Sequence, residues 1–290
     1  MGPSSAFCIV LDKIFVIAGP TASGKSAFAQ KLAKEQKGTI LNADSLQVYQ
    51  GLEILTAQPS FEDQRNIPHR LYGFLDPRET CSAGKWVTLV LIEIENIKKE
   101  GRQPIIVGGT GLYLKTLLEG ISPLPAVDPY HRKALQDQNR SQGSLYTELQ
   151  AVDPEFAKRI HPHDSQRTLR GLEIFYGTGK SLSFWQSQKS IALPYKFENI
   201  LLMPSKEELD IRMRERLEIM IHKGVLDEVA RVLALSPSPS ALKAIGLREF
   251  QSFLQGRCSF EDAKALTLLH TRQYAKRQRT WFRHQFKERC

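Results

Sequence analysis

Short apolar segments recur along the chain in a form that suits buried strands. Residues 13–19 (Lys-Ile-Phe-Val-Ile-Ala-Gly), 39–44 and 104–108 are apolar almost throughout, and a similar run occupies 199–203. Each run is short and is bounded by polar residues, glycine or proline, which is typical of strands that are buried on both faces. We therefore predict a buried parallel sheet built from these segments.

Amphipathic segments lie between the first three of these apolar runs. One begins near Gly24 and continues through residues 26–34. Residues 86–99 fit both the strand period and the helix period. We interpret them as a helix because the segment is long, ends in two lysines and precedes Gly101, where a C-terminal cap belongs. The alternation of strand and helix predicts an α/β fold.

The pattern changes at residues 122–129, where three prolines break any regular element. From there to about residue 188 the sequence is polar and helical, and the remainder after 199–203 is helical apart from a Ser/Pro loop at 236–240. We predict an α/β core formed by residues 1–121 and 189–290, interrupted by an all-helical insertion domain at 122–188.

The link between the first strand and the first helix carries candidate chemistry. Residues 19–26 (Gly-Pro-Thr-Ala-Ser-Gly-Lys-Ser) match the phosphate-loop pattern G-x-x-x-x-G-K-[ST] at every fixed position. The glycines let consecutive N–H groups point at phosphate oxygens, and the helix N-terminus adds its dipole. Lys25 would reach the outer phosphate and Ser26 could ligate Mg²⁺. The alternative is an ordinary glycine-rich turn. We predict a P-loop NTPase-like parallel sheet core, flanked by helices, that binds a phosphate or diphosphate.

A partial second match at residues 177–181 has Ile174 where the first glycine is required, so it predicts only a helix end and a turn.

The acid that usually holds Mg²⁺ in ATP-hydrolysing relatives is missing from the expected strand, because residues 104–108 run into Gly-Gly-Thr-Gly. A carboxylate instead ends another strand, as Asp44. At the carboxyl end of a parallel strand beside a phosphate loop it could be a general base or an indirect Mg²⁺ ligand. The alternative is that it caps the next turn.

Composition is ordinary for a globular protein, with 290 residues, 41% hydrophobic and 24% charged. No apolar run approaches the length that spans a bilayer, and residues 6–11 are too few for a signal-peptide core. The cysteines Cys8, Cys81, Cys258 and Cys290 lack metal-binding spacing and predict reduced thiols. We expect a cytoplasmic monomer without membrane contact.

Charge is concentrated in the second half of the chain. Residues 1–150 carry 16 Lys+Arg and 15 Asp+Glu, a net of +1, whereas residues 151–290 carry 24 and 16, a net of +8. Arg272, Lys276, Arg279 and Arg283 recur at helical spacing and predict one cationic stripe, which suits a polyanion such as nucleic acid. The alternative is a solvated helix face.

A smaller pair of cations, Arg212 and Arg216, has the same helical spacing. Both could face a bound phosphate, or they could pair with neighbouring glutamates.

Five segments occur in an order that is far more specific than any one of them: residues 19–26, 44–49, 68–71, 108–113 and 271–283. With them the chain resembles the tRNA dimethylallyltransferases, also called tRNA isopentenyltransferases, over nearly its whole length. The resemblance implies transfer of a dimethylallyl group from dimethylallyl diphosphate to N6 of adenosine 37 in tRNA. The phosphate loop would hold the diphosphate of this donor instead of a nucleoside triphosphate.

The resemblance also implies roles for single residues. Asp44 would be the general base for the adenine amine, and Thr110 would hydrogen-bond the oxygen between the prenyl carbon and the leaving diphosphate. Lys25, Arg216 and a Mg²⁺ at Ser26 would stabilise the leaving group. Adenosine 37 would be flipped out of its stack, and the helical insertion would grip the anticodon stem.

The diphosphate-binding residues implied in this way are Gly19, Pro20, Thr21, Ala22, Ser23, Gly24, Lys25, Ser26 and Arg216. The tRNA-binding residues are Asp44, Ser45, Leu46, Gln47, Thr110, Arg132, Gln166, Arg167, Thr168, Leu169, Arg170, Lys243, Ala244, Ile245, Gly246, Leu247 and Arg248.

Three positions depart from the family pattern: Leu55 replaces a usual glycine, Gln58 a lysine and Leu247 a tyrosine. None of them is Asp44, Lys25 or Thr110, so we expect activity to survive.

Other functions stay open at this point. A P-loop kinase of nucleosides or nucleotides is disfavoured by the missing acidic strand end and by the basic C-terminal half. A prenyltransferase acting on free AMP or ADP would have little use for a basic helical insertion. An RNA-binding module with a vestigial phosphate loop is the non-enzymatic alternative.

Overall fold

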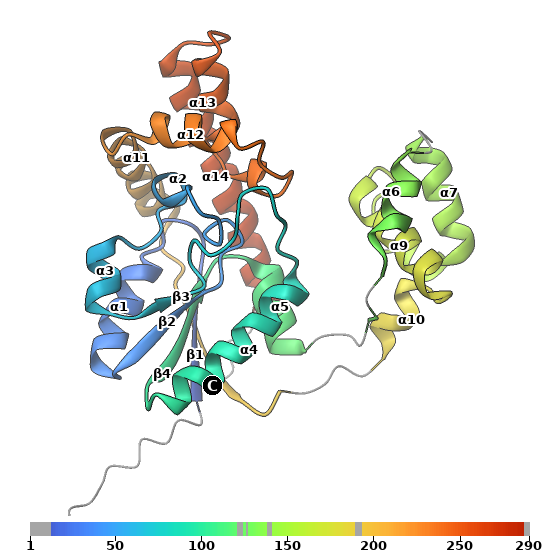
Figure 1. Cartoon of the computed structure of the whole chain (residues 1–290), viewed down its shortest axis with the longest axis horizontal. Coiled ribbons are helices and arrows are strands. Elements are labelled where there is room, and N and C mark those ends of the chain that lie inside the picture. Colours follow the sequence, from blue (N-terminus) through green and yellow to red (C-terminus); the bar gives the residue numbers. More distant parts are fainter. Residues whose placement is uncertain (1–12, 121–123, 126, 138–140, 189–192, 287–290) are drawn as a thin grey trace, which may run out of the picture. The chain divides into compact units, whose positions relative to one another are not determined.

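The computed structural model describes residues 13–120, 124–125, 127–137, 141–188 and 193–286 (Figure 1). The chain divides into two compact units, one formed by Met1–Leu118 with Pro194–Cys290 and the other by Glu119–Leu193. The sequence pattern assigned 122–188 to the insertion, and part of both junctions lies outside the described residues. Within the described ranges, no helix is long and apolar enough to span a membrane.

The first unit is built on a parallel sheet of five strands in the order β3-β2-β4-β1-β5. The predicted strands appear as β1 (Lys13–Ala18), β2 (Gly38–Asn42), β4 (Gln103–Gly108) and β5 (Lys196–Leu201). The strand β3 (His69–Arg70) was not predicted, because two polar residues carry no hydrophobic period. The P-loop NTPase-like parallel core is thereby confirmed.

The strand β5 begins earlier than the apolar run 199–203 because it is an edge strand. Lys196 pairs in register with Lys13, and Glu198 with Phe15. The ammonium of Lys13 donates to the Glu198 carboxylate at 3.1 Å, so charged side chains are accommodated at this edge.

Helices cover both faces of the sheet (Figure 1). The crossover through α1 (Lys25–Glu35) runs from β1 to β2, and the crossover through α4 (Ala83–Lys99) runs the opposite way, from β3 to β4. Since such crossovers are right-handed, the two helices lie on opposite faces. The helix α4 starts before the predicted residue 86 because Ser82 caps it, its hydroxyl accepting the N–H of Lys85.

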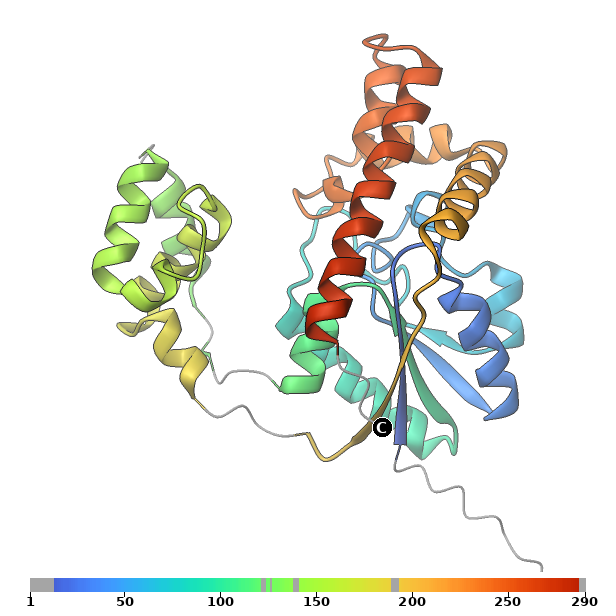
Figure 2. The same cartoon turned by 180° about the vertical axis from the view of Figure 1, so that it is seen from behind.

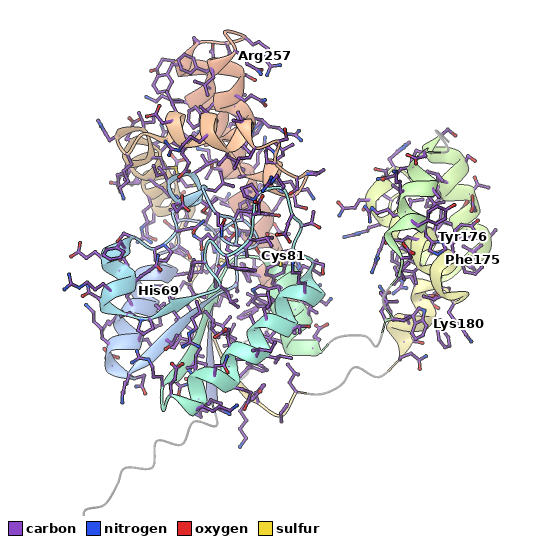
Figure 3. The ribbon with its side chains drawn as sticks, viewed as in Figure 1. His69, Cys81, Phe175, Tyr176, Lys180 and Arg257 are labelled. Atoms are coloured by element: carbon purple, nitrogen blue, oxygen red, sulfur yellow. The ribbon has the colours of Figure 1, made fainter. Side chains whose placement is uncertain are left out.

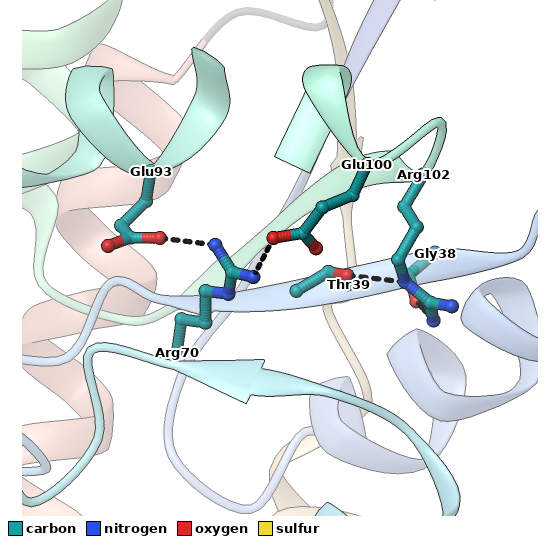
Figure 4. Close-up of polar contacts among 6 residues, drawn as sticks. All are labelled: Gly38, Thr39, Arg70, Glu93, Glu100 and Arg102. Carbon is teal, nitrogen blue, oxygen red and sulfur yellow. Dashed lines mark hydrogen bonds and ion pairs between the residues drawn. The ribbon is translucent and has the colours of Figure 1, made fainter. Parts of the chain in front are cut away.

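Two arginines stabilise the neighbouring strands β3 and β2 (Figure 4). From β3, Arg70 donates to Glu93 and to Glu100 at 2.6 Å each, which ties the edge strand to α4 and its C-terminal cap. Arg102 donates to the hydroxyl of Thr39 at 2.8 Å, at the start of β2. The edge strand β3, which has only two residues, is thereby held to α4 through Arg70.

The remaining helices of this unit gather at the carboxyl end of the sheet. Figures 1 and 2 show the last helix running from α13 down to α5. Buried residues of the loop after β2 pack there against the C-terminal helices, with Tyr49, Val229 and Phe250 in one apolar cluster. The helices are α2 (Glu53–Thr56), α3 (Phe61–Asn66), α5 (Gly111–Glu119), α11 (Lys206–His222), α12 (Val225–Ala234), η1 (Ala241–Lys243), α13 (Leu247–Leu254) and α14 (Phe260–Gln285).

The second unit is helical in its described part. Its core contains Leu149, Phe156 and Leu172. The segment 177–181 ends a helix and turns, as predicted, with Gly179 in the left-handed region at φ 68°. Figure 3 labels Phe175, Tyr176 and Lys180 around that end. The helices are α6 (Pro129–Asp137), α7 (Gln142–Val152), α8 (Pro154–Ala157), α9 (Ser165–Thr178) and α10 (Leu182–Ser187).

Two of the four cysteines are described, and both Cys81 (Figure 3) and Cys258 are free thiols, as predicted. Cys8 and Cys290 lie outside the described residues.

Candidate active site

The phosphate loop joins β1 to α1. Gly24 precedes the helix with φ 88°, a conformation that favours glycine. At Gly19 a Cβ would lie 2.3 Å from the carbonyl oxygen of Leu202, so the chain has no room for a side chain there. The Lys25 ammonium lies over the loop and donates to the Pro20 carbonyl at 2.7 Å and the Ser23 hydroxyl at 3.4 Å.

Two cations and one carboxylate converge beside this loop. Burial lowers the pKa of Lys25 to about 8; the nearby Arg216 also lowers it, and Asp44 raises it. Arg216 donates to the Thr21 hydroxyl at 3.1 Å, and burial lowers its pKa too. Its Nε atom is buried and has no hydrogen-bond partner among the described residues. The surplus of positive charge suits an anion.

Asp44 lies two residues beyond the end of β2. Its N–H donates to the side chain of Asn42 at 2.8 Å, and its Oδ1 accepts the N–H of Leu46 at 2.9 Å. The turn-capping interpretation is therefore correct for one carboxylate oxygen. The charge of the same carboxylate acts on Lys25 and Arg216, so Asp44 also belongs to the cation cluster.

Thr110 connects the loops that follow β2 and β4. Its hydroxyl oxygen accepts the N–H of Ser45 at 2.9 Å, and its O–H lies 3.2 Å from the Ser45 hydroxyl. Its own N–H donates to the Ala43 carbonyl at 3.3 Å. Two residues far apart in the sequence are thus held against one another at the carboxyl edge of the sheet.

Gln278 was not predicted as a site residue, yet it bridges the phosphate loop and the loop that follows β4. Its Oε1 accepts the N–H of Thr21 at 2.8 Å, and its Nε2 donates to the Gly109 carbonyl at 2.9 Å. A Cβ on Gly109 would lie 2.4 Å from that nitrogen, which explains a glycine there. The available signal was a polar amide on the buried face of α14, between Ala275 and Phe282.

A cavity of about 650 Å³, including space open to solvent, extends from the phosphate loop. One end is polar and is lined by Thr21, Asp44, Arg216 and Tyr274. Burial raises the pKa of the Tyr274 phenol, and the charge of Asp44 adds to the rise. The rest of the lining is mostly apolar, with three threonines among eight apolar residues: Leu46, Leu55, Thr56, Met213, Leu217, Met220, Ala244, Ile245, Thr267, Leu268 and Thr271. The arrangement suits a ligand with an anionic head and a hydrocarbon part.

Comparison with known proteins agrees with this geometry. The family model for IPP transferase matches residues 47–285. A tRNA dimethylallyltransferase of Bartonella tribocorum is 46% identical over 97% of this chain and 98% of its own length. The chain belongs to the IPP transferase family. A tRNA dimethylallyltransferase of a Chelativorans species is 45% identical over 93% of this chain and 94% of its own.

Solved structures of IPP transferases share the fold. A eukaryotic dimethylallyltransferase acting on tRNA superimposes with a TM-score of 0.80 at 31% identity, covering 93% of this chain and 70% of that one. The tRNA isopentenylpyrophosphate transferase of Bacillus halodurans gives a TM-score of 0.68 at 32% identity, covering 95% and 88%.

In this IPP transferase, the segment 243–248 forms part of the cavity wall. Ala244 and Leu247 are buried, so their side chains belong to the core, whereas Lys243 and Arg248 are exposed. Ile245 and Ala244 line the cavity. Gly246 precedes α13 with φ 101°, where only glycine is comfortable.

The segment 44–47 is shaped by hydrogen bonds. Beyond the contacts of Asp44 and Ser45, the Gln47 amide donates to the carbonyls of Thr56 and Ala57 at 2.9 and 3.0 Å. Leu46 is half-buried and contributes to the cavity. Gln47 therefore holds the short helix α2 against the end of β2.

The remaining predicted tRNA contacts lie on the helical unit. Arg132 is on α6, and residues 166–170 form the first turns of α9. Gln166 and Arg167 are exposed, but Thr168 is fully buried and Leu169 packs onto the core. Arg170 and Arg132 both contact the carboxylate of Glu173.

The cationic stripe on α14 is partly structural. Arg272 forms an ion pair with Asp210, and Arg279 donates to the Pro204 carbonyl at 2.6 Å. Lys276 and Arg283 are exposed. Sequence spacing identified the shared face, but the folded chain uses two of its cations to hold α14 in place. Of the smaller pair of cations, Arg212 forms an ion pair with Glu208 at 3.8 Å, whereas Arg216 bonds to Thr21 of the phosphate loop.

The three departures from the family pattern have structural settings. Leu55 lies in α2, and a Cβ on Gly246 would approach its Cδ1 to 2.6 Å. Gln58 donates to the Tyr49 carbonyl at 2.8 Å, which secures the loop without a cation. Leu247 is fully buried.

Proposed function

We propose that this protein transfers a dimethylallyl group from dimethylallyl diphosphate to N6 of adenosine 37 in tRNA, with release of diphosphate. The observation that carries the proposal is the composition of the cavity, which has Thr21 of the phosphate loop and Arg216 in its wall and is otherwise lined mostly by apolar residues. A nucleoside triphosphate would have little use for the aliphatic wall. A short isoprenyl diphosphate matches both parts.

The residues of the cavity and of the loops beside it suggest how the transfer proceeds. Lys25 and Arg216 bind the diphosphate, and Thr110, whose hydroxyl contacts Ser45, donates to the oxygen that bridges the prenyl carbon and the diphosphate. The adenine nitrogen attacks that carbon, the carbon–oxygen bond breaks, and the electron pair leaves with the diphosphate. Asp44 accepts the proton from N6. The fixed cations stabilise the charge that develops on the leaving group.

A Mg²⁺ ion fits this site as a partner of the donor. Ser26 lies in the first turn of α1 and is exposed, and the described residues contain no cluster of three acidic, His or Cys side chains that could hold a metal alone. Such a donor set suits Mg²⁺ held mainly by phosphates and water, with one protein hydroxyl. When bound, the ion would neutralise charge on the diphosphate.

The tRNA would contribute an unstacked loop base to the cavity and its anticodon stem to the helical unit. The names of the relatives support this part of the proposal, and the net charge of +8 over residues 151–290 suits RNA binding by the chain as a whole. Arg132, Arg167 and Arg170 are the cations of the helical unit that we expect to face phosphates.

The test is an incubation of the full chain with unmodified tRNA, Mg²⁺ and dimethylallyl diphosphate labelled in its prenyl group. We expect label in the RNA that maps to adenosine 37. Absence of label together with consumption of ATP would overturn the proposal in favour of a kinase. Strong competition by free AMP would instead indicate a prenyltransferase of free nucleotides.

The kinase alternative has one specific observation against it in the structure. The strand β4 ends at Gly108 and continues into Gly109, so no carboxylate stands at the position from which Mg²⁺ is usually held.

A further inference from the structure

A buried carboxylate in the helical unit has no role in the proposed chemistry. The side chain of Glu173, on α9, is only 7% exposed, and carboxylates are rarely buried unless they are paired. Its neighbours on the helix, Leu172 and Ile174, belong to the apolar core of the unit. Such a carboxylate must be compensated, because an isolated buried charge is strongly unfavourable.

Two arginines from different helices provide the compensation. Arg132, on α6, contacts Oε2 of Glu173 at 3.2 Å, and Arg170, one turn earlier on α9, contacts Oε1 at 3.0 Å. Each carboxylate oxygen therefore holds one guanidinium. Without the carboxylate of Glu173 between them, the two guanidinium groups would repel one another.

Both guanidinium groups also reach the surface. The side chains of Arg132 and Arg170 are 37% and 42% exposed, although their common partner is buried. A guanidinium has five N–H donors in a fixed fork, and each arginine contacts Glu173 through its Nη1 nitrogen. Donors on the outer side are therefore directed away from the core, with a net charge of +1 for the three groups together. Planar donors in this form suit phosphate oxygens.

We infer that Glu173 is a positioning residue for tRNA binding, which holds Arg132 and Arg170 side by side as a two-armed clamp for backbone phosphates. The inference rests on the proposed function, since the phosphates are those of the tRNA. Glu173 itself touches no RNA. It acts by fixing two flexible side chains before the RNA arrives, which reduces the ordering cost of binding.

If Glu173 had a purely electrostatic role, its replacement would change the affinity for RNA in the opposite direction, and this makes the inference testable. If Glu173 only neutralised its neighbours, removal of its charge would strengthen the attraction for RNA. If it positions them, removal of its charge releases one or both arginines and weakens binding. Glu173→Gln keeps the size of the side chain but presents an amide N–H₂ to one guanidinium, which cannot accept it.

The experiment measures the affinity of the full chain for unmodified tRNA, without donor, over a series of salt concentrations. We expect Glu173→Gln to weaken binding about 10-fold and to lower the salt slope by roughly one phosphate contact. The KM for dimethylallyl diphosphate should not change. The matched control is Glu155→Gln, which removes the same charge from an exposed position on α8 and should leave binding equal or slightly tighter.

A second experiment, in a variant that lacks both arginines, distinguishes a positioning role of Glu173 from a role in folding. In a chain that already carries Arg132→Gln and Arg170→Gln, Glu173→Gln should have no further effect on tRNA affinity. A persisting effect there, or loss of the helical unit's thermal transition in the single variant, would make Glu173 a stability residue and overturn the inference. Equal affinities of the Glu173 and Glu155 variants would overturn it as well. Failure of the unaltered chain to bind and prenylate tRNA would instead refute the proposed function.

Discussion

Replacement of Gln278 by methionine tests whether α14 sets the shape of the phosphate loop. The side chain is 6% exposed, accepts the Thr21 N–H at 2.8 Å and donates to the Gly109 carbonyl at 2.9 Å. Methionine has a similar volume but cannot replace either bond, so a buried donor and a buried acceptor lose their partner. Each loss costs about 1–3 kcal/mol.

We therefore expect Gln278→Met to lower the free energy of unfolding by about 2–6 kcal/mol, with a fall in melting temperature of roughly 4–24 °C at about 2–4 °C per kcal/mol. The effect on function should be larger and should concern the prenyl donor but not the binding of tRNA. Displacement of reacting groups by about 1 Å costs on the order of 100-fold in rate, so kcat/KM for the prenyl donor should fall by that order. Binding of tRNA without donor should change little, because Gln278 bonds to Thr21 and Gly109 and to none of the predicted tRNA-binding residues.

The assay is steady-state transfer of labelled prenyl groups to tRNA, with donor and tRNA varied separately, together with a melting curve. The matched control is Gln273→Met, the same exchange at an exposed position of the same helix. A Gln278 variant that melts earlier yet keeps its kcat/KM for the donor would refute the reasoning, because the bridge would then stabilise the fold without shaping the loop.

Further outcomes follow from single groups. Because burial lowers the pKa of Lys25 to about 8, the affinity for the donor should be constant at neutral pH and should fall above about pH 8, where the free protein loses this proton. Titration calorimetry at several pH values would show the fall, and Lys25→Arg should abolish it. Asp44→Asn should lower single-turnover transfer by about 100-fold or more while tRNA affinity holds, because asparagine can still accept the Leu46 N–H; unchanged turnover would exclude the base role. Gly111→Ala should destabilise by about 1–3 kcal/mol in thermal melts, since its Cβ would lie 2.5 Å from an indole ring. At Gly143 the same change meets nothing within 4 Å and should be neutral or slightly stabilising.

Local pattern was sufficient for most of the fold. The apolar runs identified β1, β2, β4 and β5, and the phosphate-loop motif placed the first helix, because these features depend on neighbours in the sequence. The edge strand β3 was not predicted, because it forms by pairing with β2 and its two residues carry no hydrophobic periodicity of their own.

The candidate site was predictable only in part for the same reason. Lys25 and Asp44 stand in recognisable local settings, so motif and strand position were enough to single them out. Gln278 contributes through contacts with residues 257 and 169 positions away, which no local pattern can express. Glu173 looked like one more helix residue until two arginines were found on its carboxylate. Regular spacing predicts that the cations of α14 share a face, but it does not reveal that Arg272 already has Asp210 as a partner.

The position of β5 has a consequence for the synthesis of this protein on the ribosome. The strand β1 lies between β4 and β5, and Lys13 pairs with Lys196. One edge of β1 therefore stays unpaired while the whole helical insertion, Glu119–Leu193, is translated, which takes roughly 4–15 s at typical elongation rates of about 5–20 residues per second.

During that interval the nascent sheet exposes an apolar strand edge, a known template for mispairing between chains. The insertion can fold as it emerges, since its core forms from its own helices. A substitution that weakens β5 would thus reduce the yield of native protein through aggregation, while each molecule that completes its sheet would keep full activity.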